Sequence, residues 1–268
     1  AAERKRVRDW LAALDSVDVA VKGASGFNYF DANGDSLKPV FLGQYRGHAI
    51  VSTRTQFQEV PNLRAVPDLE AEVAAGRIVM FNDRPMYGAE VVYVGLRLDT
   101  VSAVDLGAGT CELDFDLWFR WGGRSDPTDI QFLNAVGAVE LGQPVEEAEV
   151  DDLHYRRYRV RGRFKLDYLP SESFEHHTVG PAFVHRRLTR NNLVYVVDVV
   201  GMDLTVADSF RRQLERDAVL ATASGWRAAD AQLFQSDLER GTQGDPRLLE
   251  GSSRGLRFSS FAAKVTLE

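Results

Sequence analysis

The sequence has little cysteine, no sustained basic run and no long apolar segment, and each deficit excludes a class of structure. Cys111 is the only cysteine, so no internal disulfide can form. This fits a reducing compartment, and it equally fits a bacterial envelope domain that does without disulfides. No run of about 18 apolar residues occurs, so we expect no membrane-spanning helix in this chain. The N-terminal AAERKRVRDW also lacks the apolar region of a signal peptide.

The overall composition is that of a globular protein. Of the 268 residues, 44% are hydrophobic and 26% are charged, which separates the chain from disordered sequences. The net charge is −7, and the basic residues form no continuous block. We therefore do not expect nucleic acid as a partner.

The pattern of elements predicts a mainly β protein with a small α+β extension at its N-terminal end. Apolar residues at helical spacing predict a helix over 3–14, and Pro and Gly at its ends predict another over 67–76. Asn33-Gly34 and residues 77–87 indicate hairpins. We predict residues 1–88 as the extension and residues 89–268 as an immunoglobulin-like β-sandwich. Its strands are expected in VVYVGLRLDTVSAVD, CELDFDLWFRW, TDIQFLNAV, HYRRYRVRGRFKLDY, NLVYVVDVV and RFSSFAAKVTL.

Two later segments are predicted to be irregular. Residues 206–221 could contain one or two helical turns or form a polar loop. Residues 236–255 are rich in Gly, Ser and charged residues and are predicted to be a loop.

Three polar motifs could bind a metal, but a simpler interpretation is better for each. DANGD (residues 31–35) spaces its oxygens like a calcium loop, yet Ser36 and Leu42 stand where that loop needs Gly and Glu, so a turn is preferred. His176 and His177 would point to opposite faces of a strand, and their spacing to His185 fits no zinc pattern. The acidic run EEAEVDD (residues 146–152) is interpreted as a solvated loop, with a divalent-cation site as the alternative. We expect no bound metal.

Catalytic motifs are lacking. The sequence contains no G-x-S-x-G elbow, no phosphate-binding loop and no dinucleotide fingerprint, and Cys111 has no evident histidine partner. We therefore predict a protein that is not an enzyme and uses no cofactor.

The stretch ELDFDLWFRWGG (residues 112–123) alternates between two kinds of side chain. Phe115, Leu117 and Phe119 share one face, which we expect to pack in the core. Trp118 and Arg120 lie on the other face, together with two aspartates. Such a surface of aromatic rings and guanidinium groups can bind carboxylates or cations, although a solvated charged face is the simpler interpretation.

From Val91 onward the chain resembles the extracellular ligand-binding domain of prokaryotic pentameric ligand-gated ion channels, the bacterial relatives of Cys-loop receptors. The similar segments occur in the family's order, over about two thirds of the chain. VVYVGLRLDTVSAVD resembles the first strand, LDFDLWFRW the strand of loop D, and PTDIQFLNA loop A. YRRYRVRGRFKLDY resembles the loop E strands, and ESFEHHTVGPAFVHRRLTRNNLVYVVD the short bacterial Cys-loop equivalent followed by loop B. SGW (residues 224–226) and LRFSSFAAKVTLE resemble the start of the ninth strand and the last strand before the membrane.

The resemblance implies a ligand-sensing domain on the periplasmic or extracellular side of an inner-membrane protein. Five copies would form a head-to-tail ring, anchored by a C-terminal pore domain, with a small-molecule ligand between neighbours. On the principal side it implies Phe132, Asn134, Arg187 and Arg190 as ligand-binding residues. On the complementary side it implies Trp118, Arg120, Tyr158 and Arg161. Phe174 and Glu175 would couple ligand binding to the membrane region.

The chain departs from the family pattern at several positions. The short loop reads Glu172, Ser173, Phe174 and Glu175 where the family has an aromatic residue, Pro, Phe and Asp. Gly180-Pro181 interrupts a strand that is usually continuous, so that strand should be bulged, shortened or at an edge. Loop C, within residues 236–255, has no aromatic residue. Together with Arg186, Arg187 and Arg190 near loop B, this favours an anionic or polar ligand over a quaternary amine.

Residues 1–62 carry a second resemblance, to the tail of a type I periplasmic substrate-binding protein, which ends with a helix and a G-x-x-x-F-D-x-N-G-D hairpin. This suggests an alternative function, a periplasmic solute-binding protein that serves an ABC-type transporter. The segment is too short to close a two-lobed cleft. A third possibility is an assembly or adhesion module that keeps the fold without a ligand site.

Overall fold

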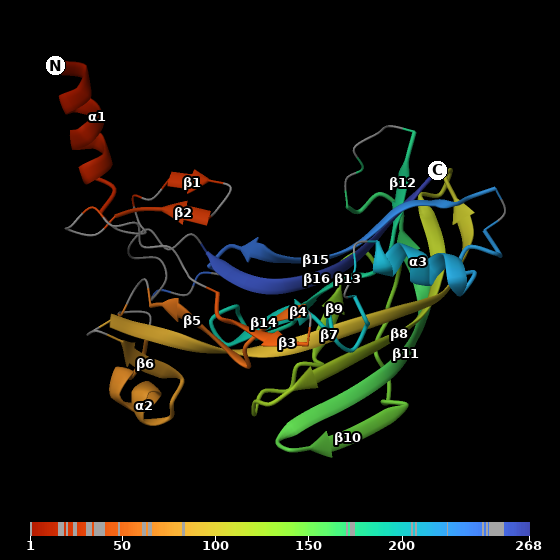
Figure 1. Ribbon diagram of the computed structural model, residues 1–268, viewed down its shortest axis with the longest axis horizontal. Helices are drawn as coiled ribbons and strands as arrows, with labels where there is room; N and C mark the ends of the chain where they lie inside the picture. Colours follow the sequence, from red (N-terminus) through yellow and green to blue (C-terminus); the bar gives the residue numbers. More distant parts are fainter. Residues whose placement is uncertain are drawn as a thin grey trace. The chain divides into compact units, whose positions relative to one another are not determined.

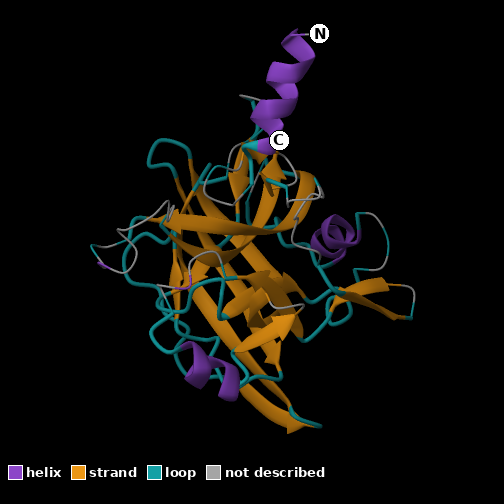
Figure 2. Cartoon of the chain, turned by 90° about the vertical axis from the view of Figure 1, so that its left-hand side faces the viewer, coloured by secondary structure: helices purple, strands orange, loops and turns teal. Residues whose placement is uncertain are grey.

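The computed structural model describes residues 2–15, 19, 21–23, 26–30, 34, 41–47, 49–60, 63, 66–81, 84–169, 171, 175–204, 206, 208–223, 225–242, 244, 246 and 255–268. Strands account for about half of this part of the chain, and helices for much less of it (Figure 2). The chain forms two compact units. The first comprises Ala1–Phe41, Phe57–Gly88 and Glu239–Leu256, and the second comprises Leu42–Gln56, Ala89–Leu238 and Arg257–Glu268.

The first unit contains the predicted N-terminal elements. Helix α1 (Ala2–Ala12) has no buried residue, and β1 (Val21–Gly23) pairs with β2 (Gly26–Asn28). The predicted helix over 67–76 is α2 (Leu69–Ala74). It begins where the Asp68 carboxylate accepts a hydrogen bond from the Ala71 N–H at 2.9 Å, which satisfies a backbone group that a helix start leaves open.

The predicted hairpin at residues 77–87 is also confirmed. Strand β6 (Ile78–Phe81) pairs with the first residues of β7 (Arg84–Asp105), in the register Ile78 to Tyr87. Ile78 is buried against Val60 and Val66, so this small unit has a core of its own. The predicted turn at Asn33-Gly34 and the DANGD motif lie mainly outside the described residues.

The second unit is a sandwich of two sheets, which confirms the predicted mainly β fold. The larger sheet runs β10-β11-β8-β7-β14, and β5 (Thr55–Glu59) and β6 also pair with β7. Figure 1 shows β8, β11 and β10 side by side. Neighbours along this order are antiparallel except for β14, which pairs with β7 in parallel. The bounds are β8 (Thr110–Trp121), β10 (Glu146–Val150), β11 (Leu153–Lys165) and β14 (Leu193–Val197).

The smaller sheet has β16 (Leu256–Leu267) between β15 (Ala228–Arg240) on one side and two short strands on the other. These are β12 (His177–Val179) and β13 (Ala182–His185), and β9 (Ile130–Phe132) pairs with β13. Gly180-Pro181 separates β12 from β13, as the sequence suggested. Both strands nevertheless keep one register on β16, since Val179 pairs with Val265 and Ala182 with Ala262.

The core between the two sheets is rich in aromatic rings. Phe115 and Phe119 of β8 meet Phe132 and Phe183 of the smaller sheet, with ring centroids 6.1 and 5.9 Å apart. Phe115, Leu117 and Phe119 are all fully buried, as the alternation of the strand predicted. Edge-to-face contacts of this kind stabilise a core beyond the area that they bury.

A short hairpin covers part of the outer face of the larger sheet. Strands β3 (Gly43–Arg46) and β4 (Ala49–Ser52) pair with each other, and the Tyr93 hydroxyl donates to the Ser52 carbonyl at 2.7 Å. A second apolar cluster lies on β7 and β14 at this face, formed by Ala89, Val91, Tyr93, Val194 and Val196.

The predicted boundary at residue 88 coincides with one break between the two units, but residues 42–56 belong to the second unit.

Two local predictions need correction, and a third is decided between its alternatives. Most of the acidic run forms strand β10 because it pairs with β11, and Asp151 and Asp152 make the turn with φ of 47° and 62°. Residues 206–221 contain the short helix that was one of the predicted alternatives, α3 (Ser209–Arg216), whose Phe210 and Leu214 are buried. Strand β15 extends to Arg240, so it includes the start of the segment predicted as loop C.

Candidate functional site

The structure brings the predicted loops A and B together. Strand β9 ends at Phe132 and pairs with β13, whose end, His185, begins the loop B segment. The Arg187 side chain pairs with Asp129 at 2.9 Å, and the Arg186 guanidinium donates to the Ile130 carbonyl at 2.8 Å. Two segments 56 to 58 residues apart in sequence thus form one polar surface, which we call the arginine edge (Arg186, Arg187 and Asp129).

His185 fixes the backbone beneath the arginine edge. The backbone N–H groups of Arg187 and Leu188 donate to its Nδ1 atom at 3.1 and 2.8 Å. Its Nε2 atom is 3.0 Å from the Asp126 carbonyl, which can only accept, so the ring is neutral with its proton on Nε2. Burial lowers the pKa of His185, which favours the same neutral form.

Phe132 and Asn134 lie inside the sandwich. Phe132 is part of the aromatic core, where it packs against Phe115 and Phe164. Asn134 is 1% exposed and bridges the break between β12 and β13. Its amide donates to the Gly180 carbonyl at 2.8 Å and accepts from the Ala182 N–H at 3.0 Å. Both residues are therefore held by the fold, and in this conformation neither offers a surface to a ligand.

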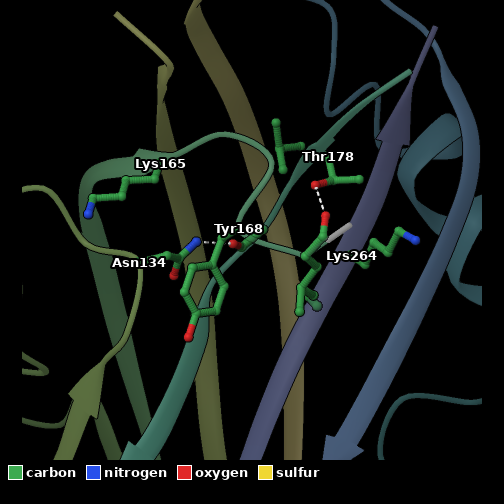
Figure 3. A pocket seen from close by; sticks show the side chains of 9 residues that line it. Asn134, Lys165, Tyr168, Thr178 and Lys264 are labelled. Atoms are coloured by element: carbon green, nitrogen blue, oxygen red, sulfur yellow. Dashed lines mark hydrogen bonds between the residues drawn. The ribbon is translucent and has the colours of Figure 1, made fainter. Parts of the chain in front are cut away.

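A small cavity lies next to Asn134, between the Tyr168 region and β16 (Figure 3). Its volume is about 10 Å³, enough for one water molecule but too small for an organic ligand. The ammonium groups of Lys165 and Lys264 point away from it (Figure 3). This cavity does not enlarge the candidate site.

On the complementary side, Trp118 and Arg120 share one buried carboxylate. The Trp118 indole N–H donates to Asp198 at 3.1 Å, and the Arg120 guanidinium donates to the same carboxylate at 2.6 Å. The guanidinium also lies over the Tyr93 ring, 4.4 Å from its centroid. Gly95 makes room for the indole, because a Cβ atom there would lie 2.0 Å from it.

This group of Tyr93, Trp118, Arg120 and Asp198, which we call the Asp198 cluster, has the composition of a cation site. Aromatic faces and a carboxylate are the groups that bind ammonium or guanidinium ions. Here the cation is the protein's own Arg120, whose side chain is 31% exposed. The cluster therefore holds no vacancy for a quaternary amine.

Arg161 and Tyr158 do not lie on the same face, so they cannot line one site together. Successive side chains of a strand point to opposite faces, so the odd-numbered and even-numbered residues of β11 lie on different faces of the sheet. Tyr158 is 3% exposed and packs against Phe119, whereas Arg161 pairs with Asp114 at 2.8 Å and its side chain is 73% exposed. Tyr158 therefore belongs to the core, and not to the outer face that carries Arg161.

Around Arg161 the outer face of the sheet carries a dense set of ion pairs. Arg159 pairs with Asp99, Asp114 and Asp116, and Asp116 also accepts from Arg97 and Arg157 at 2.9 and 3.0 Å. Carboxylates and guanidiniums alternate across three strands, so they compensate each other's charge within the sheet.

Arg190 connects the loop B segment to β15 rather than to the arginine edge. Its guanidinium forms an ion pair with Asp237, and its backbone N–H donates to the Arg257 carbonyl at 2.8 Å. Both side chains of the pair are largely buried, with 18% and 22% exposure. Arg190 thus fixes the base of the segment predicted as loop C.

Phe174, one of the two predicted coupling residues, lies outside the described part of the chain. Glu175 is described and exposed. The histidines that follow contact carboxylates at two other elements, His176 with Glu268 at 3.7 Å and His177 with Asp167 at 2.8 Å. This places the end of β16 beside the start of β12.

Neither a metal site nor a reactive thiol stands out in the described residues. Within them, no group of three or more His, Cys, Asp or Glu side chains is arranged to hold a metal ion. Burial raises the pKa of Cys111 to about 12, so the thiol stays protonated and unreactive.

None of the described helices has the length and apolar character of a membrane span.

Sequence reasoning missed Asp198 and Asp129 and considered His185 only as a metal ligand, although each of the three organises a predicted site residue. Asp198 directly follows the apolar run LVYVV, and a carboxylate at the end of a buried strand needs a buried cation or donor. This position could have predicted that Asp198 pairs with an arginine. Which arginine it selects depends on the parallel pairing of β14 with β7, which no local pattern reveals.

The chain was also compared with known protein families and with curated proteins, and neither comparison gave a match.

Proposed function

We propose that the second unit is the ligand-sensing ectodomain of a bacterial channel-type receptor, which binds a small polar or anionic ligand between neighbouring copies. The main support is the strand pairing. It sets the predicted loop A segment beside loop B through β9 and β13, and the predicted loop D strand beside the loop E strand through β8 and β11. These two pairs belong to different sheets of one sandwich. A head-to-tail arrangement of copies would bring them together across an interface.

The proposed ligand class rests on the arginine edge. Arg187 projects from it with 82% of its side chain exposed, and the carboxylate of Asp129, with which it pairs, is shared with Arg186. Guanidinium groups bind carboxylates in a forked geometry. The Asp198 cluster is already filled by Arg120, so a cationic ligand finds no aromatic cage there.

Calorimetry against small mono- and dicarboxylates, with tetramethylammonium as the contrasting probe, tests the ligand class. A carboxylate should bind, and Arg187→Gln should weaken its binding about tenfold, the equivalent of one charge-assisted hydrogen bond. Arg163→Gln serves as the matched control, because Arg163 is an exposed arginine that pairs with Glu112 on the larger sheet, whereas the arginine edge adjoins β9 and β13 of the smaller sheet. Binding of tetramethylammonium alone would contradict the proposed ligand class.

The receptor itself is tested by the coding sequence beyond Glu268 and by the assembly of the protein. We expect four apolar segments of about 20 residues downstream, each long enough to cross a membrane. A stable two-fold dimer in light scattering would contradict the ring. Tight binding of a solute by a monomer would support the alternative solute-binding function.

A further inference from the structure

We propose that His185 is a proton-controlled latch of the arginine edge. Its neutral ring holds the backbone of Arg187 and Leu188, and its protonated ring releases them. The consequence for ligands, that an anion is bound more weakly at acidic pH, rests on the proposed function. The release of the backbone does not rest on it, so the two parts can be measured separately.

The latch is the Nδ1 atom of His185, whose ring is 2% exposed. This atom accepts hydrogen bonds from the backbone N–H groups of Arg187 and Leu188 at 3.1 and 2.8 Å. On the other side of the ring, Nε2 donates to the Asp126 carbonyl at 3.0 Å. An imidazolium ion has two N–H donors and no acceptor, so neither orientation of a protonated ring can accept the two backbone bonds. Protonation therefore removes both bonds at once.

The chain on either side of the latch is anchored by other contacts. The Arg186 N–H donates to the Asp129 carbonyl, and the Arg190 N–H donates to a carbonyl of β16, each at 2.8 Å. Loss of the latch therefore frees residues 187–188 between two fixed points and leaves β13 and β14 in place. The freed stretch carries the exposed guanidinium of the arginine edge.

The surroundings of the ring favour its neutral form near pH 7. Burial lowers the pKa of His185, and the positive charge of Arg187 acts in the same direction. The Asp126 carbonyl and the carboxylates of Asp129 and Asp126 act against them, but the pKa still lies below its ordinary value of 6.5. The two backbone bonds are therefore present above pH 6.5 and are lost as the pH falls through the lower pKa of the folded protein.

Two neighbouring groups from other elements keep their state while the ring titrates. Burial raises the pKa of Asp126, but hydrogen bonds from Thr128 and the charge of Arg156 outweigh it and keep the carboxylate ionised. Arg156 of β11 lies 3.7 Å from this carboxylate. Burial raises the pKa of Tyr195 of β14, so its hydroxyl, which donates to the Pro127 carbonyl, stays neutral. Neither group supplies the proton-dependent change at the latch.

An open latch should weaken the binding of an anion at the arginine edge. The Arg187 guanidinium pairs with Asp129 at 2.9 Å, and its fixed backbone limits the directions in which it can point. With residues 187–188 free, a ligand must restore their order when it binds, which lowers its affinity. Charge alone predicts the opposite, because a protonated ring adds positive charge beside the anion. The direction of the pH dependence therefore distinguishes the latch from simple electrostatics.

Hydrogen exchange measured by NMR on the 268-residue protein tests the release. Between about pH 7.5 and about pH 4.5, the amides of Arg187 and Leu188 should lose at least about tenfold in protection relative to His185→Asn at the same pH. The asparagine oxygen can accept both bonds and does not titrate, and comparison at one pH removes the direct effect of pH on exchange. His177→Asn is the control, because His177 contacts Asp167 at another element, and it should leave the loss of protection unchanged.

The ¹⁵N chemical shifts of the His185 ring follow its protonation in the wild-type protein, so this measurement needs no variant. Loss of protection should occur together with protonation of the ring. Amides of Arg187 and Leu188 that stay protected after the ring is protonated would overturn the proposal. A ring that stays neutral until the whole protein unfolds would overturn it as well.

Calorimetry with pyruvate, a carboxylate that stays ionised over this pH range, tests the consequence for ligands. The affinity of the wild-type protein should fall about tenfold toward about pH 4.5, whereas that of His185→Asn should change little. A wild-type affinity that rises as the pH falls would overturn the control of binding by the latch. Absence of pyruvate binding at every pH would count against the proposed ligand class, and the exchange measurement would still decide the latch.

Discussion

On β8, residues that point into the sandwich alternate with residues that point out of it, and different forces hold the two sets. The inward set, with Phe115 and Phe119, is fully buried among other rings. In the outward set, Trp118 and Arg120 are fixed by one carboxylate, Asp198. Apolar burial depends on area and tolerates many neighbours, whereas Trp118 and Arg120 depend on a single partner at a defined place. The following predictions test this difference.

The largest effect is expected on the inward side. Phe119→Ala should reduce the free energy of unfolding by about 4 kcal/mol, because it leaves a cavity between Tyr158, Phe183 and Tyr195. Urea unfolding measures the change. A loss below about 1 kcal/mol would mean that the core relaxes around the missing ring.

On the outward side, Asp198→Asn should cost about 2 kcal/mol, since it leaves the partly exposed Arg120 without its carboxylate. In an Arg120→Met background the same change should cost about 1 kcal/mol less. Equal costs in both backgrounds, measured by urea unfolding, would show that Asp198 acts through Trp118 or the backbone instead.

A smaller and pH-dependent effect is expected from His185. Its pKa in the folded protein lies below the ordinary value of 6.5, so the unfolded chain takes up the proton first as the pH falls. The stabilisation from the neutral ring is therefore complete above the ordinary pKa of 6.5 and decreases as the pH falls below it. His185→Gln should flatten this part of the stability profile, and an unchanged slope would assign the pH dependence to other groups.

The smallest effect is expected at the exposed end of the outward face. Arg161→Ala should change the free energy of unfolding by less than about 0.5 kcal/mol, because its pair with Asp114 is solvated and Asp114 also pairs with Arg159. Thermal unfolding at low and high salt checks this value. A loss of more than about 1 kcal/mol would make the ion pairs of this face part of the protein's stability.

The alternation of β8 and β11 was enough to predict their two faces and the mainly β class, since a period of two needs no knowledge of neighbouring strands. The helices at 3–14 and 67–76 were predicted from spacing and end residues. The partners of the polar side chains were not predictable in this way. Arg120 pairs with Asp198 and Arg190 with Asp237 only after distant strands pair, so local sequence does not identify the partner in either contact.

The acidic run shows a second limit. Its composition is typical of a solvated loop, but the facing arginines of β11 supply charge partners that make a strand favourable. The preference of such a segment for a strand conformation therefore depends on both paired strands and cannot be predicted from one of them alone. The role of Asn134 also depends on a distant segment. Its amide hydrogen-bonds the Gly180 carbonyl and the Ala182 N–H, two backbone groups beside the break at Gly180-Pro181.

The division into units has a practical consequence for shortening the protein. The chain passes from one unit to the other five times, and residues 42–56 lie in the second unit. A protein that begins at Ala89 would lose the β3–β4 hairpin and uncover the apolar cluster around Val91 and Val196. We expect such a fragment to aggregate, whereas a fusion that keeps residues 42–56 attached through a short linker should remain in solution.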